Sequence, residues 1–154
     1  MKNTLLGIIV ASGVIICDLA TKSLAVLFLD APVDIIPGFA SFELHKNPGL
    51  SFSIPFPNAM QIVISLFLLV LLVVYSKQEQ RSLIEHLALA SIFGGAIGNL
   101  TERILFASVT DFISIWKFPV FNIADIAISL GVVVLLTVEL FFSKKPKPQE
   151  QLSK

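Results

Sequence analysis

Residues 59–75 read AMQIVISLFLLVLLVVY and contain no charged side chain. With its flanks this apolar run covers 58–76, close to the roughly 20 residues that an α-helix needs to cross the hydrocarbon core of a bilayer. Three other stretches, about 5–29, 84–106 and 121–142, are similarly long and apolar. The sequence therefore predicts four transmembrane helices.

The composition of the whole chain agrees with a membrane protein. Of its 154 residues, 55% are hydrophobic and 14% are charged, and the mean hydropathy is +0.87. A soluble domain has about 25% charged residues. The formal net charge is zero and gives no indication of nucleic-acid binding, and the single cysteine excludes an intrachain disulfide. We expect an all-α integral membrane protein whose residues 1–154 form a single membrane-embedded domain.

Lysine and arginine are distributed unevenly between the loops. Seven lie at the two termini or in the 77–83 loop, whereas only Lys46 and Lys117 lie in the segments 30–57 and 107–120. By the positive-inside rule, both termini are cytoplasmic and these two segments are external. The first external segment alternates like a strand around Phe39, Phe42 and Leu44, which predicts a small β element. The basic tail, 144–154, is expected to be disordered.

Polar residues near the spans gather toward the outer side. They are Asp18, Lys22, Asn99, Glu102, Arg103, Asp111, Asn122 and Asp125, whereas the inner halves are nearly bare of such groups apart from Glu139. Ionisable groups in a membrane are costly, and one-sided clustering of them indicates a site. Purely structural interpretations remain open for some of these residues. Asp18 and Lys22 are spaced i and i+4, as in an ion pair that stabilises a helix, and GGAIG at 94–98 is typical of close helix packing. Arg103 could hold a carboxylate such as Asp18, a backbone carbonyl, or a lipid or substrate group.

Asp111 and Asp125 are the strongest candidates for chemistry. Each lies at the outer end of a predicted span, and the short 107–120 connection can bring them together. Two adjacent carboxylates cannot both ionise easily, so one keeps a proton while the other acts as a base. Helix capping is the alternative. It explains Asp111 poorly, because we expect this residue at the C-terminal end of a helix, where the dipole disfavours negative charge.

Five motifs together resemble a known family. In chain order they are DLATK (18–22), NPGLSFS (47–53), GGAIGNLTER (94–103), VTDF (109–112) and FNIAD (121–125). Each is weak alone, but in this order and spacing they resemble the signature blocks of the lipoprotein signal peptidases, or signal peptidase II. Two positions depart from the usual pattern: Glu102 stands where an aspartate is usual, and Leu50 where a small residue is commoner.

The resemblance implies a multi-pass aspartic endopeptidase of the bacterial inner membrane, with its active site at the outer face. Such an enzyme cleaves the signal peptide from lipidated prolipoproteins just before the diacylglyceryl-modified cysteine, needs no cofactor or metal, and is inhibited by globomycin. The catalytic pair would be Asp111 and Asp125. Substrate or inhibitor would contact Asn47, Gly49, Asn99, Arg103 and Asn122, while Asp18 and Lys22 would support the site. We further expect membrane lipid as a partner, no nucleic acid, and a monomer.

Three other functions are compatible with parts of this pattern. A proton or ion pathway would need polar groups across the whole bilayer, and the predicted inner halves are nearly bare. A non-catalytic adaptor would use the same pocket only to bind a partner helix. A serine protease is disfavoured, because Lys22 and Ser23 are adjacent and point to different faces of a helix.

Overall fold

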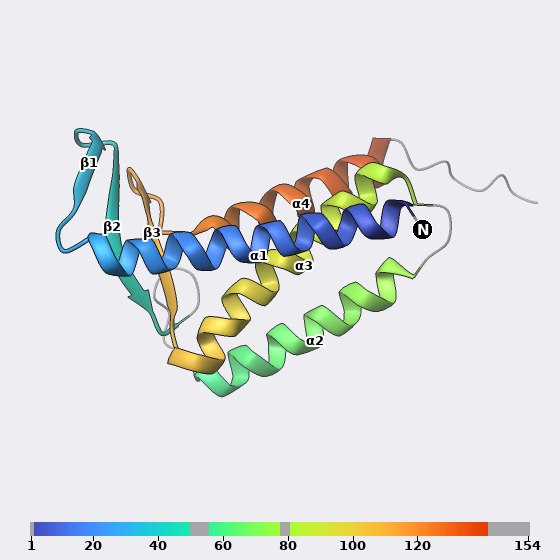
Figure 1. The fold of residues 1–154 in the computed structure, drawn as a ribbon, viewed down its shortest axis with the longest axis horizontal. Helices are drawn as coiled ribbons and strands as arrows, with labels where there is room; N and C mark the ends of the chain where they lie inside the picture. The colour runs from blue at the N-terminus through green and yellow to red at the C-terminus, as the bar shows by residue number, and fades with distance from the viewer. Residues whose placement is uncertain (1, 50–55, 78–80, 142–154) are drawn as a thin grey trace, which may run out of the picture.

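The computed structural model describes residues 2–49, 56–77 and 81–141. Four helices and three strands follow one another along the chain (Figure 1). The helices are α1 (Lys2–Phe28), α2 (Asn58–Ser76), α3 (Leu83–Phe106) and α4 (Ile123–Phe141), and the strands are β1 (Val33–Ile36), β2 (Ala40–Asn47) and β3 (Val109–Ile115). The predicted disordered tail and Leu50 lie outside the described residues.

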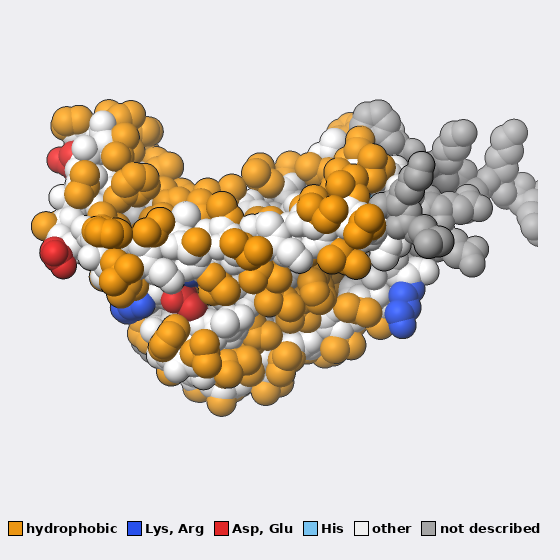
Figure 2. All heavy atoms as spheres, in the orientation of Figure 1, with side chains coloured by type: hydrophobic (Ala, Val, Ile, Leu, Met, Phe, Trp, Pro, Cys, Tyr) orange, Lys and Arg blue, Asp and Glu red, His pale blue; other side chains and the backbone are white. Residues whose placement is uncertain are grey.

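All four helices are long and apolar enough to span a membrane, as predicted. Figure 2 shows hydrophobic side chains along the whole length of the bundle, which suits a surface in contact with lipid rather than water. The start of α1, the end of α2, the start of α3 and the end of α4 lie at one end of the bundle, and the sheet lies at the other (Figure 1). The chain is a multi-pass membrane protein.

Helix α3 is the centre of the bundle. Within its apolar window 39% of residues are buried, compared with 6% in α1 and 11% in both α2 and α4. Glycines allow its neighbours to approach closely: a Cβ at Gly94 would lie 2.7 Å from the Ala11 carbonyl oxygen of α1, and one at Gly95 would lie 2.6 Å from the Ala124 carbonyl oxygen of α4. The packing role predicted for residues 94–98 is confirmed.

The predicted β element exists, but it is larger than expected. Strands β1, β2 and β3 form an antiparallel sheet in that order, in which His45 of β2 lies opposite Asp111 of β3. The third strand comes from the second external segment, which we expected to be only a connection. Its sequence, VTDFISI, is rich in β-branched and aromatic residues, which favour a strand. Strand β3 therefore carries Asp111 to the sheet rather than leaving it at a helix end.

Candidate active site

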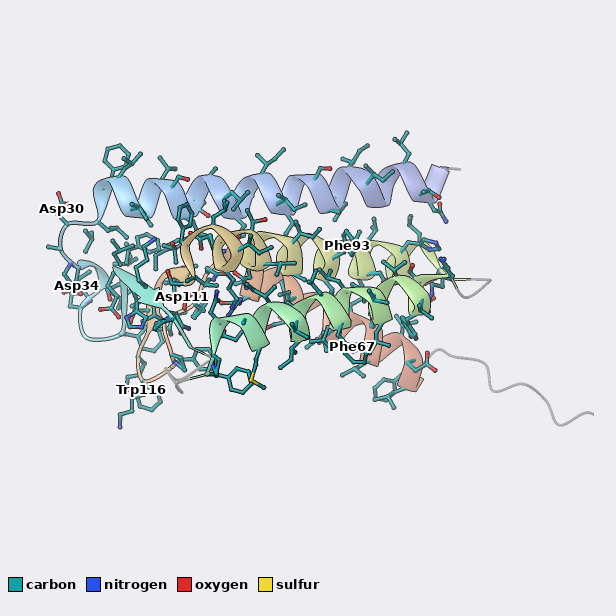
Figure 3. The ribbon with its side chains drawn as sticks, turned by 90° about the horizontal axis from the view of Figure 1, so that it is seen from below. Asp30, Asp34, Phe67, Phe93, Asp111 and Trp116 are labelled. Atoms are coloured by element: carbon teal, nitrogen blue, oxygen red, sulfur yellow. The ribbon has the colours of Figure 1, made fainter. Side chains whose placement is uncertain are left out.

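Asp111 is the third residue of β3 and lies where the sheet meets the helices (Figure 3). The expectation that it ends a helix was wrong, because α3 stops at Phe106 and Ala107 closes it in the left-handed conformation. The Asp111 side chain is 3% exposed. It accepts hydrogen bonds from Asn47 Nδ2 at 3.0 Å and from Asn122 Nδ2 at 2.7 Å. Helix capping therefore does not account for this carboxylate.

Asp125 is held at the first turn of α4 by a reciprocal cap. The Asp125 backbone N–H donates to Asn122 Oδ1 at 2.9 Å, and the Asn122 backbone N–H donates to Asp125 Oδ2 at 3.3 Å. This is the geometry of a capping box, here built from Asn and Asp. The spacing of FNIAD is thus explained locally by capping. Capping uses only one carboxylate oxygen of Asp125.

Two asparagines link the two aspartates. Asn122 Nδ2 donates both to Asp111 Oδ1 and to Asn99 Oδ1, the latter at 3.2 Å. Asn99 Nδ2 in turn donates to Asp125 Oδ1 at 2.9 Å. The carboxylates are thus fixed on opposite sides of one amide cluster, and within the described residues neither forms a salt bridge. Neutral donors orient them without tying either to a cation.

Burial changes the acidity of Asp111. The pKa of its carboxyl is raised from 3.8 to about 6, chiefly because burial removes it from water, and the negative charge of Asp125 contributes to this rise. The hydrogen bonds from Asn47 and Asn122 oppose this rise. A carboxyl group with a pKa near 6 can both take up and release a proton close to neutral pH. Asp111 therefore has the acidity that a general acid or base requires.

Gly49 determines which way the Asn47 amide faces. Its backbone N–H donates to Asn47 Oδ1 at 3.0 Å, so the Nδ2 group is left to donate to Asp111. Because the donor is the backbone of Gly49, this residue contributes to the site without a side chain. The structure thus places Asn47 beside Asp111, and Gly49 beside Asn47.

A buried charge network lies behind the amide cluster. Lys22 Nζ donates to Asp18 Oδ2 at 2.7 Å and to Asn99 Oδ1 at 2.8 Å, and it is 3.5 Å from Glu102 Oε2. The predicted ion pair within α1 is present, with Asp18 0% and Lys22 2% exposed. Asp18 Oδ1 also accepts from the backbone N–H of Ala124 at 2.9 Å. Helices α1, α3 and α4 are therefore joined directly beneath Asp125.

Glu102 attaches the start of β3 to α3. Its carboxylate accepts from the Thr110 backbone N–H at 2.7 Å and from the Thr110 hydroxyl at 2.6 Å. Thr110 is the residue before Asp111, so this clamp fixes the point from which the Asp111 side chain projects. Glu102, which stands where the family usually has an aspartate, thus accepts a hydrogen bond with each of its two carboxylate oxygens.

Arg103 has a partner that sequence reasoning missed. Its Nε donates to Gln61 Oε1 of α2 at 2.9 Å, which is none of the partners considered above. Gln61 Nε2 donates to the carbonyl oxygens of Pro48 at 3.0 Å and Phe56 at 2.8 Å. A lone amide near the end of an otherwise apolar span was the available signal, because a buried polar group in a membrane needs partners.

The two aspartates face a common cavity of about 310 Å³, which Asn47, Asn99 and Arg103 also line. A second, apolar groove of about 510 Å³ lies between α2, α3 and α4 and shares Asn99, Arg103 and Ile128 with this candidate catalytic cavity. In the described part of the chain, no three His, Cys, Asp or Glu side chains group as they would around a metal ion. The arrangement offers two carboxylates, amide donors and one guanidinium beside an apolar groove.

Comparison with known proteins decides the family. The profile of signal peptidase (SPase) II matches residues 10–142. The chain belongs to the signal peptidase II family. This membership confirms the resemblance drawn from the five motifs, and it makes the chain a protease of the signal peptidase II type.

Individual members of the signal peptidase II family match over most of their length. A lipoprotein signal peptidase of Coxiella burnetii is 38% identical over 150 residues, covering 88% of this chain and 89% of that protein. One from Caldicellulosiruptor bescii is 36% identical over 146 residues, covering 90% and 97%. A solved bacterial membrane enzyme superposes with a TM-score of 0.79 at 29% identity, covering 93% of this chain and 94% of that one. The fold is thus that of a known membrane enzyme.

Proposed function

We propose that this signal peptidase II removes the signal peptide from diacylglyceryl-modified prolipoproteins, cutting just before the lipidated cysteine, with Asp111 and Asp125 as its catalytic pair. One observation carries the assignment of the pair: two aspartates from different elements are linked through Asn122 and open into one cavity. Two carboxylates in shared surroundings, one buried and the other half-buried, suit aspartic-protease chemistry.

The proposed reaction uses the dyad as one acid–base unit. The ionised carboxylate removes a proton from a water molecule as the water attacks the scissile carbonyl, and the protonated one donates a hydrogen bond to the carbonyl oxygen. Collapse of the tetrahedral intermediate transfers a proton to the leaving amine. The raised pKa of Asp111 supports such proton exchange near neutral pH. The amides of Asn47, Asn99 and Asn122 hold the carboxylates in place during these steps.

The apolar groove is the place we assign to the signal helix. It is lined mainly by leucine, isoleucine and valine, and it reaches the catalytic cavity at Asn99 and Arg103. A signal peptide has an apolar core of about 7–15 residues, which suits such a groove better than water. Arg103 stands where the groove ends. Because Gln61 holds it by one nitrogen, its other nitrogens are placed to donate to carbonyls of the bound peptide.

We further propose that the enzyme lies in the bacterial inner membrane as a single domain and a monomer. The charge distribution of the loops supports cytoplasmic termini and an active site at the outer face. Globomycin, an inhibitor of the family, would compete for the cavity lined by Asn47, Asn99 and Arg103. Membrane lipid would surround the substrate's diacylglyceryl tails beside the cavity.

The test is cleavage of a diacylglyceryl-modified prolipoprotein by purified protein in detergent. The native protein is expected to cut before the lipidated cysteine, whereas Asp111→Asn and Asp125→Asn are expected to be folded and inactive. Asp34→Asn, which changes an exposed aspartate of β1, is the matched control and should retain the native rate. An inert native protein would contradict the function, and full activity in either catalytic-site variant would contradict the assignment of the pair.

A further inference from the structure

A second polar cavity adjoins the active site on the side of the sheet. This polar groove has a volume of about 380 Å³ and lies along β2 and the turn after β3. The side chains that belong to it alone are Glu43, His45, Ser114, Trp116 and Lys117. An irregularity in the pairing of β2 with β3 lies between Phe42 and His45, and both Glu43 and His45 line the groove there. The polar groove thus presents charges of both signs to a ligand.

The polar groove is continuous with the catalytic cavity. The two share the lining residues Asn47, Phe118, Pro119 and Val120. The catalytic cavity also shares Asn99, Arg103 and Ile128 with the apolar groove, while the apolar and polar grooves have no lining residue in common. The catalytic cavity therefore lies between them. An extended chain entering along the apolar groove and passing Asp111 and Asp125 would continue into the polar groove.

The turn that forms the groove wall is held in an unusual backbone conformation. Trp116 has a positive φ of 48°, and its backbone N–H donates to the Phe39 carbonyl oxygen at 2.6 Å. Its ring is 68% exposed, and Lys117 Nζ lies 5.1 Å from the ring centroid. Left-handed backbone is unfavourable for a bulky residue and is often kept at ligand sites. The contact with the ring holds the Lys117 ammonium group at the groove.

The two products of the reaction differ in chemistry as the two grooves do. The signal peptide is apolar, whereas the chain that follows the cut leaves the membrane and is in contact with water. We propose that the polar groove binds the first residues after the modified cysteine, and that Glu43 and Lys117 select among them by charge. This proposal rests on the proposed function, because it assigns a further part of the same substrate.

Strand geometry indicates which substrate positions are read. His45 lies directly opposite Asp111, one strand away, at a spacing of about 5 Å. Glu43 is two residues farther along β2, across the irregularity in its pairing, which places it at most about 7 Å from His45. An extended peptide advances about 3.3 Å per residue. The second to fourth residues after the cut are therefore those that would lie near Glu43 and Lys117.

Three matched substrates test this assignment. They are diacylglyceryl-modified prolipoproteins that carry acidic, basic or uncharged residues at the second to fourth positions after the cut. For each, kcat/KM is measured with the native enzyme, Glu43→Lys and Lys117→Glu. Glu43→Lys is expected to shift the ratio of acidic to basic substrate cleavage by roughly tenfold toward the acidic one, since partly exposed charge contacts are modest. Lys117→Glu is expected to shift it the opposite way, and cleavage of the uncharged substrate should remain near the native rate.

Asp34→Lys is the matched control, because it makes the same charge change as Glu43→Lys on the same sheet (Figure 3), and Asp34 does not line the polar groove. It is expected to leave the ratio unchanged. An equal shift in this control would show that the net charge of the sheet, rather than the groove, is sensed. Unchanged ratios in both groove variants, or equal losses on all three substrates, would overturn the proposal while the native cleavage still supported the proposed function. Failure of the native enzyme on every substrate would refute the function instead.

Discussion

Replacement of Asp111 by asparagine should separate the stability of this protein from its activity. In the folded protein the pKa of Asp111 is raised by burial from 3.8 to about 6. Between these two values the unfolded chain has lost the proton while the folded chain still keeps it. Raising the pH through this window therefore favours unfolding. Each unit of difference between the folded and unfolded pKa corresponds to about 1.4 kcal/mol. The full rise in the pKa of Asp111 therefore corresponds to about 3 kcal/mol in the free energy of unfolding.

The asparagine variant does not titrate at this position, so it escapes that loss. Its new amide meets the donors of Asn47 and Asn122, and this adds an energy difference that does not depend on pH. The diagnostic quantity is how the difference in unfolding free energy between variant and native protein changes with pH. The free energy of unfolding of the variant minus that of the native protein should increase by about 2.5 kcal/mol between about pH 4 and about pH 7.

The assay is equilibrium unfolding in non-ionic detergent micelles, followed by far-ultraviolet circular dichroism of the helices across this pH range. Asp34→Asn, on the exposed strand β1, serves as the control and is expected to follow the native curve. A difference between Asp111→Asn and native protein that stays constant with pH would refute the reasoning. It would mean that Asp111 is as well solvated as an ordinary surface carboxylate.

Three further predictions concern the support of the site. Lys22→Met leaves Asp18 buried without its cation, and unfolding measurements should show a loss of roughly 3–5 kcal/mol; a loss below about 1 kcal/mol would show that the ion pair is dispensable. Gly98→Ala places a methyl group against the Asp18 carboxylate and should lower the thermal midpoint clearly, whereas Gly13→Ala, which meets nothing within 4 Å, should not; equal midpoints would contradict the packing. Gln61→Ala removes the acceptor of the Arg103 Nε–H, and a hydrogen bond to a charged group is worth about 1.5–3 kcal/mol. The variant should cleave prolipoprotein at least tenfold more slowly. A native rate would show that Arg103 needs no such partner.

The spans were predictable because their physical requirement is simple. A helix must be apolar over the thickness of the hydrocarbon core, so length and hydropathy suffice. The span predicted at 58–76 was found as Asn58–Ser76, and the others shifted by only a few residues at their ends. The packing of residues 94–98 was also predictable, since small residues mark close helix contacts.

The sheet and the support of the site were harder to predict. Strand β3 was missed because its short run of seven residues lies between two long apolar segments that dominate any hydropathy pattern. The position of Asp111 was misjudged for the same reason. Gln61 was overlooked because none of its three hydrogen-bond partners lies at a helical spacing from it. They are the Arg103 side chain of another helix and the backbone carbonyls of Pro48 and Phe56, which precede α2. Periodicity says nothing about such partners. The clustering of Asn99, Asn122 and the two aspartates was predicted only as a group at one end of the bundle.

Helix α2 packs chiefly on α3, and the apolar groove is lined by side chains of α2, α3 and α4. Because its walls belong to helices that can span a membrane, the groove lies at the depth of the hydrocarbon core. A prolipoprotein anchored in the same bilayer would then meet the enzyme by two-dimensional diffusion and enter from the side. Its encounter rate would depend on its number per membrane area and on lipid viscosity. Dilution in detergent should therefore slow capture far more than it slows the cut.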